Sequence, residues 1–331
     1  MLMSWLAVLG GLILLVWSAE RFVHGAAGLA GNLGVSPLII GMTIMGFGTS
    51  APEMLVSGMA AFNGNPAMGI GNALGSNIAN IAMVLGATAL IVPLSVDSRI
   101  LRREYPMLFA VTLLAGGLML DGELGTLDGS ILLTSTVLLV IWMIWMGKQP
   151  APASANVGTP TTDPLTSEFE SEIPTDMTTG WAIFWAVLGL VILVLSSKLL
   201  VWGAVNIAHD LGISDLVIGL TIIAIGTSLP ELAATMMSAL KGEDDMAVGN
   251  IIGSNMFNLL AVLALPGLIA PSVLEPAVLQ RDFPVVVALT IALFLMAYGF
   301  KGPGRINRLE GGLLLAGFAA YMSWLALTGL S

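Results

Sequence analysis

Apolar runs divide almost the whole chain, and this pattern restricts the fold more than any other feature. Most of the runs contain the ~20 residues that a helix needs to cross a membrane. Only 10% of the residues are charged, whereas soluble globular proteins carry about 25%. Backbone polar groups inside a bilayer must be satisfied within the protein, and runs of this length favour helices over a β-barrel. The sequence therefore predicts an all-α membrane protein.

Ten of these runs are expected to cross the membrane, and no cleavable signal is expected before the first. The predicted spans are 2–33, 35–62, 67–92, 106–120, 124–146, 180–208, 213–240, 246–269, 283–300 and 309–330. The first is long enough to be tilted or to extend past the bilayer. The chain has no cysteine, which excludes thiolate metal sites and disulfides.

Lys and Arg are distributed unevenly among the predicted loops. On the side of the two termini the loops contain only Arg281, and the remaining loop cations lie on the opposite side: Arg99, Arg102, Arg103, Lys148, Lys241, Lys301, Arg305 and Arg308. Because short cytoplasmic loops are enriched in Lys and Arg, both termini are predicted to be outside. The segment 148–179 is then cytoplasmic.

The segment 148–179 is the one soluble-looking part of the chain. It is rich in Pro, Ser, Thr and Ala, and it carries several of the acidic residues behind the net charge of −10. We interpret it as a flexible acidic linker between two halves. A calcium-sensing loop is the alternative, but these acids lack the spacing and the glycine of an EF-hand.

One six-residue motif interrupts two of the apolar runs. It reads Gly48-Thr-Ser-Ala-Pro-Glu53 in the second predicted span and Gly226-Thr-Ser-Leu-Pro-Glu231 in the seventh. Each copy places a carboxylate and two hydroxyls at a depth where ionisable groups are energetically expensive. Glutamate is not a helix-packing residue, so Glu53 and Glu231 predict a functional site that faces the protein interior or water.

The two copies belong to a longer internal repeat. The offset of 178 that relates Gly48 to Gly226 aligns roughly half of positions 36–85 with identical residues in 214–263. Five spans, an odd number, separate equivalent points, so the second repeat enters the membrane upside down. The predicted fold is therefore two inverted five-helix repeats, 1–147 and 180–331, joined by the 148–179 linker. Their glutamates are expected to meet near the midplane.

The motifs supply oxygen ligands on broken helices. Proline has no N–H, so Pro52 tends to release the carbonyl of Gly48, and Pro230 that of Gly226. The candidate ligand side chains are Thr49, Ser50, Glu53, Thr227, Ser228 and Glu231 from the motifs, with Ser76, Asn80, Ser254 and Asn258 from the following spans. Hard oxygen ligands suit Ca²⁺ or Na⁺ rather than zinc or copper. One Ca²⁺, two Na⁺ or protons neutralise two carboxylates, and this competition is a physical basis for exchange.

Other small and polar residues of the repeat have a simpler interpretation. Gly71, Gly75, Gly249 and Gly253 are expected to allow close helix packing. Asn77 and Asn255 lie off the ligand face of their helices. We expect them to form hydrogen bonds between helices.

The paired motifs resemble the two alpha-repeats of the Ca²⁺/cation antiporter superfamily, in particular its prokaryotic Na⁺/Ca²⁺ exchanger (YrbG-type) branch. The resemblance rests on the two six-residue motifs and on the segments Gly71-Asn-Ala-Leu-Gly-Ser-Asn-Ile-Ala-Asn80 and Gly249-Asn-Ile-Ile-Gly-Ser-Asn-Met-Phe-Asn258. It implies a core made of the second, third, seventh and eighth helices. The first and sixth helices would form a long, tilted gating pair.

The resemblance also implies the site and the cargo. Besides the ten side chains above, the main-chain oxygens of Gly46 and Ala224 would complete the ion sites. Some relatives, potassium-dependent exchangers among them, have Asp where this chain has Asn258, which argues against K⁺ cotransport. The family implies no enzymatic activity and no cofactor. It implies the lipid bilayer of a prokaryotic inner membrane as the environment, with no nucleic acid and no obligate protein partner.

The function expected from these features is exchange of Ca²⁺ for Na⁺ by alternating access at the two glutamates. A Ca²⁺/H⁺ exchanger, with the same glutamates as proton carriers, remains open. A passive cation channel is a second alternative, which the inverted duplication disfavours. An intramembrane hydrolase using Ser50 or Ser228 would lack a base, because neither histidine lies near the motifs.

Overall fold

A computed structural model describes residues 1–34, 48–96, 98–147, 177–298 and 304–329 of the chain. The first half contains α1 (Leu2–Asn32), α4 (Ala51–Phe62), α5 (Pro66–Ile78), η2 (Ala79–Leu85), α6 (Gly86–Ile91), β1 (Leu94–Val96), α7 (Ser98–Met119), β2 (Glu123–Leu124) and α8 (Thr126–Gly147). The second half begins with α10 (Thr179–Leu211), α11 (Asp215–Ile218), η3 (Gly219–Ile223), α12 (Ala224–Thr227) and α13 (Leu229–Lys241). It continues with α14 (Asp244–Phe257), η4 (Asn258–Val262), α15 (Leu263–Ile269), β3 (Ser272–Val273), η5 (Val278–Asp282), α16 (Phe283–Ala297), β4 (Gly304–Ile306) and α17 (Arg308–Gly329).

The helices account for the predicted spans. Within the described residues, seven helices are long and apolar enough to cross a membrane, and the pair Asp215–Thr227 and Leu229–Lys241, bent by 42°, adds a broken eighth span. The predicted fourth span is the shorter apolar helix Glu104–Met119. Of the predicted second span, the structure describes the part from Gly48 onward, which contains α4. The all-helical multispan fold is thus confirmed.

Two helical segments, one from each repeat, are far more buried than the other spanning helices. In Pro66–Ile91 and Asp244–Ile269, 78% and 83% of the most apolar stretch is buried, against 22–39% in the other spanning helices. These two segments are the third and eighth predicted spans, which follow the glutamate motifs. Each contains a π-helical segment, η2 or η4, that begins within one residue of a predicted asparagine ligand. Short π-segments inside α-helices are frequent at functional sites.

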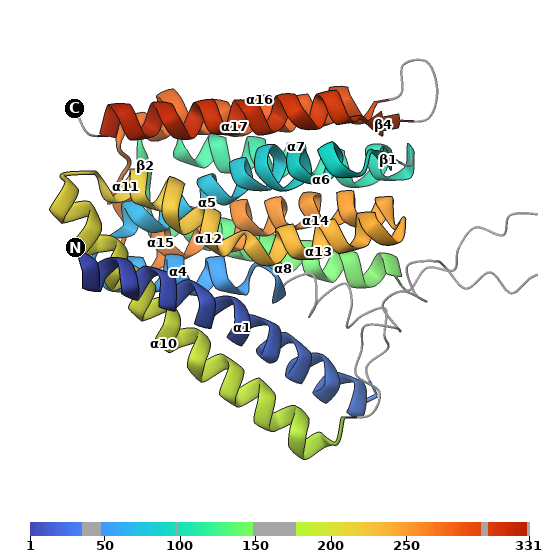
Figure 1. Cartoon of the computed structure of the whole chain (residues 1–331), viewed down its shortest axis with the longest axis horizontal. Coiled ribbons are helices and arrows are strands. Elements are labelled where there is room, and N and C mark those ends of the chain that lie inside the picture. Colours follow the sequence, from blue (N-terminus) through green and yellow to red (C-terminus); the bar gives the residue numbers. More distant parts are fainter. Residues whose placement is uncertain (35–47, 97, 148–176, 299–303, 330–331) are drawn as a thin grey trace, which may run out of the picture.

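The pairing of the four short strands is consistent with an inverted repeat. β1 pairs with β4 antiparallel, with Leu94 opposite Ile306, while β2 pairs with β3, with Leu124 opposite Ser272. The offset of 178 carries β1 onto residues 272–274, which contain β3. Each of these two equivalent strands therefore pairs with a strand from the other repeat. The β1–β4 sheet and the β2 strand lie at opposite ends of the bundle (Figure 1), as two repeats of opposite orientation require.

α1 and α10 form an antiparallel pair that is inclined to the remaining helices (Figure 1). At 1.5 Å per residue, the 31 residues of α1 span about 46 Å, more than the ~30 Å hydrocarbon core of a bilayer. The pair is tied at both ends. The Met1 amino group contacts the Asp210 carboxylate at 3.2 Å, and the Asn32 side chain donates to the Met177 carbonyl at 2.9 Å.

Small residues at seven-residue intervals line the contact between α1 and α10. Gly11, Ser18 and Gly25 recur, at the offset of 178, as Gly189, Ser196 and Gly203. A Cβ on Gly25 would collide with the backbone of Ala186, and one on Gly189 would lie 2.5 Å from the Phe22 nitrogen. The Ser18 and Ser196 hydroxyls donate to their own helices, at 3.1 and 3.0 Å. The two helices thus touch through backbone, without side-chain hydrogen bonds from these serines across the contact.

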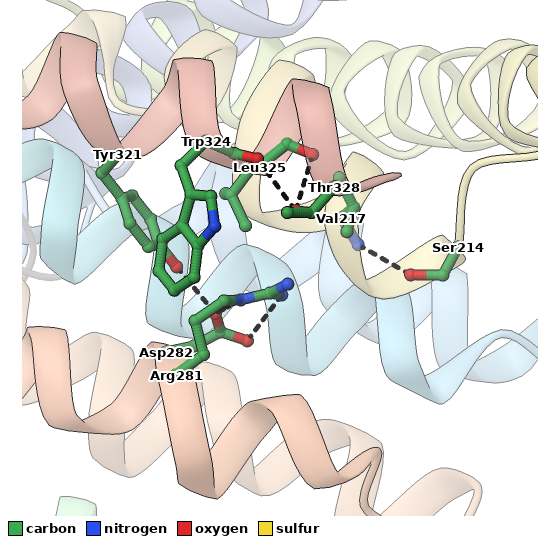
Figure 2. A network of polar contacts seen from close by, with 8 residues as sticks. All are labelled: Ser214, Val217, Arg281, Asp282, Tyr321, Trp324, Leu325 and Thr328. Atoms are coloured by element: carbon green, nitrogen blue, oxygen red, sulfur yellow. Dashed lines mark hydrogen bonds and ion pairs between the residues drawn. The ribbon is translucent and has the colours of Figure 1, made fainter. Parts of the chain in front are cut away.

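A polar cluster connects η5, which directly precedes α16, with α17. The Arg281 guanidinium donates to both oxygens of the Asp282 carboxylate, at 2.5 and 3.2 Å, and the Tyr321 hydroxyl donates to the same group at 2.7 Å (Figure 2). Because this pairing satisfies the charges, the helical span starts at Val278 instead of at residue 283 as predicted. Close by, partial burial raises the pKa of the Glu275 carboxyl, against the lowering effect of Arg281.

The α1–α10 contact gives a direct test of the packing. Gly25→Ala is expected to destabilise the protein by about 1–3 kcal/mol, because a methyl group there overlaps the α10 backbone. Thermal unfolding of the purified protein in detergent measures the effect. Gly10→Ala, on the same helix, is the matched control, since a Cβ at Gly10 meets nothing within 4 Å. Equal unfolding temperatures for the two variants would contradict this account of the interface.

Candidate ion-binding site

Glu53 and Glu231 are the third residues of α4 and α13, and both side chains are completely buried. None of their four carboxylate oxygens has a hydrogen-bond partner among the described residues. Glu53 comes from the first repeat and Glu231 from the second. A buried carboxylate without a partner is very unfavourable in an apolar interior. The pair therefore has the properties of a cation site.

The break in each motif has the same geometry. Ser50 has φ −87° and ψ 2°, and its counterpart Ser228 has φ −83° and ψ 6°. Each serine caps a helix whose second residue is proline, which cannot donate a hydrogen bond to the preceding turn. The predicted helix break is confirmed at Ser228, where α12 ends and α13 begins at an angle of 42°. The serine hydroxyl at each break is completely buried.

Two pairs of hydroxyls that were predicted to be ligands lie close together across the repeat boundary. The Thr49 oxygen lies 3.4 Å from that of Ser254, and the Ser76 oxygen lies 3.5 Å from that of Thr227. Both contacts join one repeat to the other. The Ser50 and Ser228 hydroxyls are buried and, within the described parts of the chain, have no hydrogen-bond partner. Each motif thus contacts the span that follows the other motif in the opposite repeat.

The two amide ligands have different surroundings. Asn80 and Asn258 are completely buried near the starts of η2 and η4. The Asn80 Nδ2 donates to Asn255 Oδ1 at 3.1 Å, which leaves its Oδ1 without a partner among the described residues. Neither amide atom of Asn258 has such a partner. The expected hydrogen bond between helices is confirmed for Asn255. It is wrong for Asn77, whose Nδ2 donates to the Ala73 carbonyl of its own helix at 2.9 Å.

Asn72 connects both motifs, although the sequence analysis gave it no role. Its Nδ2 donates to the main-chain oxygen of Glu53 at 3.1 Å and to Ser57 Oγ at 2.9 Å. Its Oδ1 accepts from the Thr227 hydroxyl at 3.2 Å. The internal repeat contains the signal that could have identified it, because Asn250 occupies the equivalent position. Asn250 donates to Thr235 at 3.0 Å, the counterpart of the Asn72–Ser57 bond.

The predicted packing glycines are confirmed in the first repeat. A Cβ at Gly71 would collide with the Leu216 carbonyl, and one at Gly75 would lie 2.8 Å from the Leu220 Cα. α5 thus packs directly on the broken second-repeat helix. The offset of 178 places the equivalent partners of Gly249 and Gly253 in 35–47, outside the described residues.

Two main-chain ligands were also predicted. Gly46 lies outside the described residues. Ala224 is buried at the start of α12, and its carbonyl accepts the Ser228 N–H at 3.1 Å. The Thr227 hydroxyl lies 3.4 Å from the same oxygen, so two donors already surround this carbonyl.

The donor set contains few charges. Across the part of the chain that the structure describes, no group of three or more His, Cys, Asp or Glu residues forms a metal cluster. Two carboxylates with hydroxyl, amide and carbonyl oxygens match the preferences of Ca²⁺ and of alkali cations, and they do not match those of zinc or copper.

Comparison with known proteins agrees with this geometry. The sequence model of the family described as "Sodium/calcium exchanger protein" matches residues 3–145 and 181–327. The putative antiporter CaxA of Alkalimonas amylolytica is 50% identical over 321 residues, which cover 97% of this chain and 98% of that protein. The inner membrane protein YrbG of Escherichia coli (strain K12) is 40% identical over 325 residues, with 98% and 97% covered.

A solved structure has the same fold. The sodium-calcium exchanger NCX_Mj, soaked with 100 mM Na⁺ and 10 mM Sr²⁺, superposes with a TM-score of 0.65 at 31% sequence identity, and the match covers 97% of this chain and 98% of that one. The matches span nearly the full length and both repeats, and they point to transport rather than enzymatic catalysis. The chain is therefore a multispan membrane protein of the sodium/calcium exchanger family.

Proposed function

We propose that this protein exchanges Ca²⁺ for Na⁺ across a membrane by alternating access at Glu53 and Glu231. The observation that carries the proposal is that the two buried carboxylates come from opposite repeats and have no hydrogen-bond partner among the described residues. Elsewhere a buried acid of this chain, Asp282, is paired with Arg281 and Tyr321. The charge that neutralises the two glutamates is then supplied by the transported ion.

The proposed ligand set provides oxygens in the number that Ca²⁺ requires. Ca²⁺ takes about 6–8 oxygen ligands, with flexible geometry. The set comprises Thr49, Ser50, Glu53, Ser76, Asn80, Thr227, Ser228, Glu231, Ser254 and Asn258, with main-chain oxygens of Gly46 and Ala224. Such a surplus allows either one Ca²⁺ or several Na⁺ to be held by overlapping subsets. Because both ions need the same two carboxylates, occupancy by one excludes the other.

The charge of the two carboxylates also explains why transport of one ion would depend on return of the other. With the site empty, two bare carboxylates would face an apolar barrier, so the conversion between the two facing states is unfavourable. With the site occupied, the charge is neutralised and the conversion can proceed. We assign the conversion to movement of α1 and α10 across the core. Their length, their tied ends and the close backbone contact at Gly25 and Gly189 support movement as a pair.

The setting follows from the positive charges and from the relatives. YrbG is an inner membrane protein, and we place this chain in the inner membrane of a prokaryote with both termini outside and 148–179 in the cytoplasm. α1 begins and α17 ends at the same end of the bundle (Figure 1), as an even number of spans requires. With Na⁺ entering the cell, Ca²⁺ would leave it. The proposed repeats are 1–147 and 180–331.

The carboxylates can be tested individually. Glu53→Gln keeps the size of the side chain and removes its charge, so Na⁺-driven uptake of radioactive Ca²⁺ into everted vesicles is expected to fall by at least about 100-fold, as for loss of one partner of a buried charge pair. Glu123→Gln is the matched control, because Glu123 is exposed in β2 at the end of the bundle. Uptake by the Glu53 variant equal to that of the control would refute the site assignment.

The counter-ion is tested by separate gradients. The protein in proteoliposomes is loaded with Na⁺, K⁺ or H⁺ in turn, and uptake of radioactive Ca²⁺ is followed. A Na⁺ gradient is expected to drive uptake, and a K⁺ gradient is not, because Asn258 adds no third carboxylate. Uptake driven by a pH gradient without Na⁺ would select Ca²⁺/H⁺ exchange by the same glutamates. Ca²⁺ flux that persists with no exchangeable ion on the other side would instead indicate a passive channel.

A further inference from the structure

We infer that Asn255 is a positioning residue that fixes the Asn80 amide with its oxygen directed at the transported cation. The inference rests on the proposed function, since it assigns a role to a neighbour of a proposed ligand. Asn255 itself is not in the ligand set. Its side chain lies in the second repeat, and the amide that it holds belongs to the first.

The contact is short and completely enclosed. Asn80 Nδ2 donates to Asn255 Oδ1 at 3.1 Å, and both side chains are 0% exposed. The Asn80 Oδ1, at the other end of the amide, has no hydrogen-bond partner among the described residues. One end of this amide is thus held by protein, and the other is left for a ligand.

A cation distinguishes the two ends of an amide. The carbonyl oxygen coordinates Ca²⁺ or Na⁺, whereas the NH₂ group presents positive hydrogens that repel them. The terminal torsion of asparagine is broad and roughly two-fold, so the side chain alone does not choose between these orientations. A hydrogen bond to the NH₂ group favours the productive one, by about tenfold for a typical buried bond.

The residue equivalent to Asn255 in the first repeat, Asn77, makes a different hydrogen bond. Asn77, at the equivalent position, donates its Nδ2 to the carbonyl of Ala73, one turn earlier in its own helix. The Nδ2 of Asn255 makes no such bond and has no partner among the described residues. Asn255 therefore makes no side-chain hydrogen bond to its own helix, and its oxygen accepts one from Asn80.

The mirror-image contact is not formed in this structure. Asn258 corresponds to Asn80, and Asn77 to Asn255, yet Asn258 Nδ2 and Asn77 Oδ1 both lack partners among the described residues. Only one of the two amide ligands is held in this way. Asn77 is consequently a matched control, since it is a buried asparagine one turn from Asn80 on the same helical segment and does not bind that amide.

A double-mutant cycle on Ca²⁺ affinity tests the inference. Equilibrium binding of Ca²⁺ to the purified full-length protein, without Na⁺, is measured for Asn255→Leu, Asn80→Ala and the double variant. Asn255→Leu is expected to weaken binding about tenfold. In the Asn80→Ala background it is expected to have no further effect, because its target is gone. Asn255→Asp keeps the acceptor oxygen and is expected to bind Ca²⁺ at least as tightly as wild type.

The control cycle uses Asn77→Leu, whose effect is expected to multiply with that of Asn80→Ala. Size-exclusion profiles and unfolding temperatures report folding, and Asn255→Ala replaces Asn255→Leu should the latter not fold. Independent effects of Asn255 and Asn80, or weak binding by Asn255→Asp, would overturn the positioning role while leaving the proposed function intact. Wild-type protein that binds neither Ca²⁺ nor Na⁺ would overturn the proposed function and this inference together.

Discussion

A carboxylate inside a membrane protein has to be neutralised, and the structure meets this requirement in two ways. Asp282 is completely buried, but it accepts hydrogen bonds from Arg281 and Tyr321. Glu53 and Glu231 are buried to the same degree, and their carboxylate oxygens have no hydrogen-bond partner among the described residues. The pairing of Asp282 with these two residues connects η5 with α17. For the other two acids we propose that the neutralising charge is supplied by the transported cation, and that the predicted ligands surround this pair of carboxylates.

One of the two unpaired carboxylates comes from each repeat, so neither repeat forms the proposed site alone. Thr49 meets Ser254, Ser76 meets Thr227, and Asn80 meets Asn255, each across the repeat boundary. Asn72 adds a bridge from the main chain of Glu53 to the Thr227 hydroxyl. These three contacts join proposed ligand groups of one repeat to the opposite repeat. An ion bound at the proposed site would therefore bind to both halves at once.

The sequence predicted the features that depend on chain composition and spacing. Apolar runs defined the spans, proline fixed the helix breaks before Glu53 and Glu231, and the ungapped offset required the motifs to meet. The sequence did not predict which hydrogen-bond partner each buried side chain has. Asn77 and Asn255 both follow a Gly-Ser pair and precede another asparagine by three residues, yet one bonds its own helix and the other accepts from Asn80. The start of the ninth span was misplaced for the same reason, because pairing with Asp282 lets Arg281 lie inside the helix.

Such differences between equivalent residues follow from the inverted fold itself. If the two repeats had identical surroundings, the site would be equally open or equally closed to both sides of the membrane. A carrier that faces one side at a time must therefore break the symmetry, and the residues whose contacts differ mark where it is broken. Asn255 is bonded to Asn80 whereas Asn77 is not bonded to Asn258. Under the alternating access that we propose, the repeats would exchange surroundings in the opposite facing state, and the Asn258–Asn77 pair would then form.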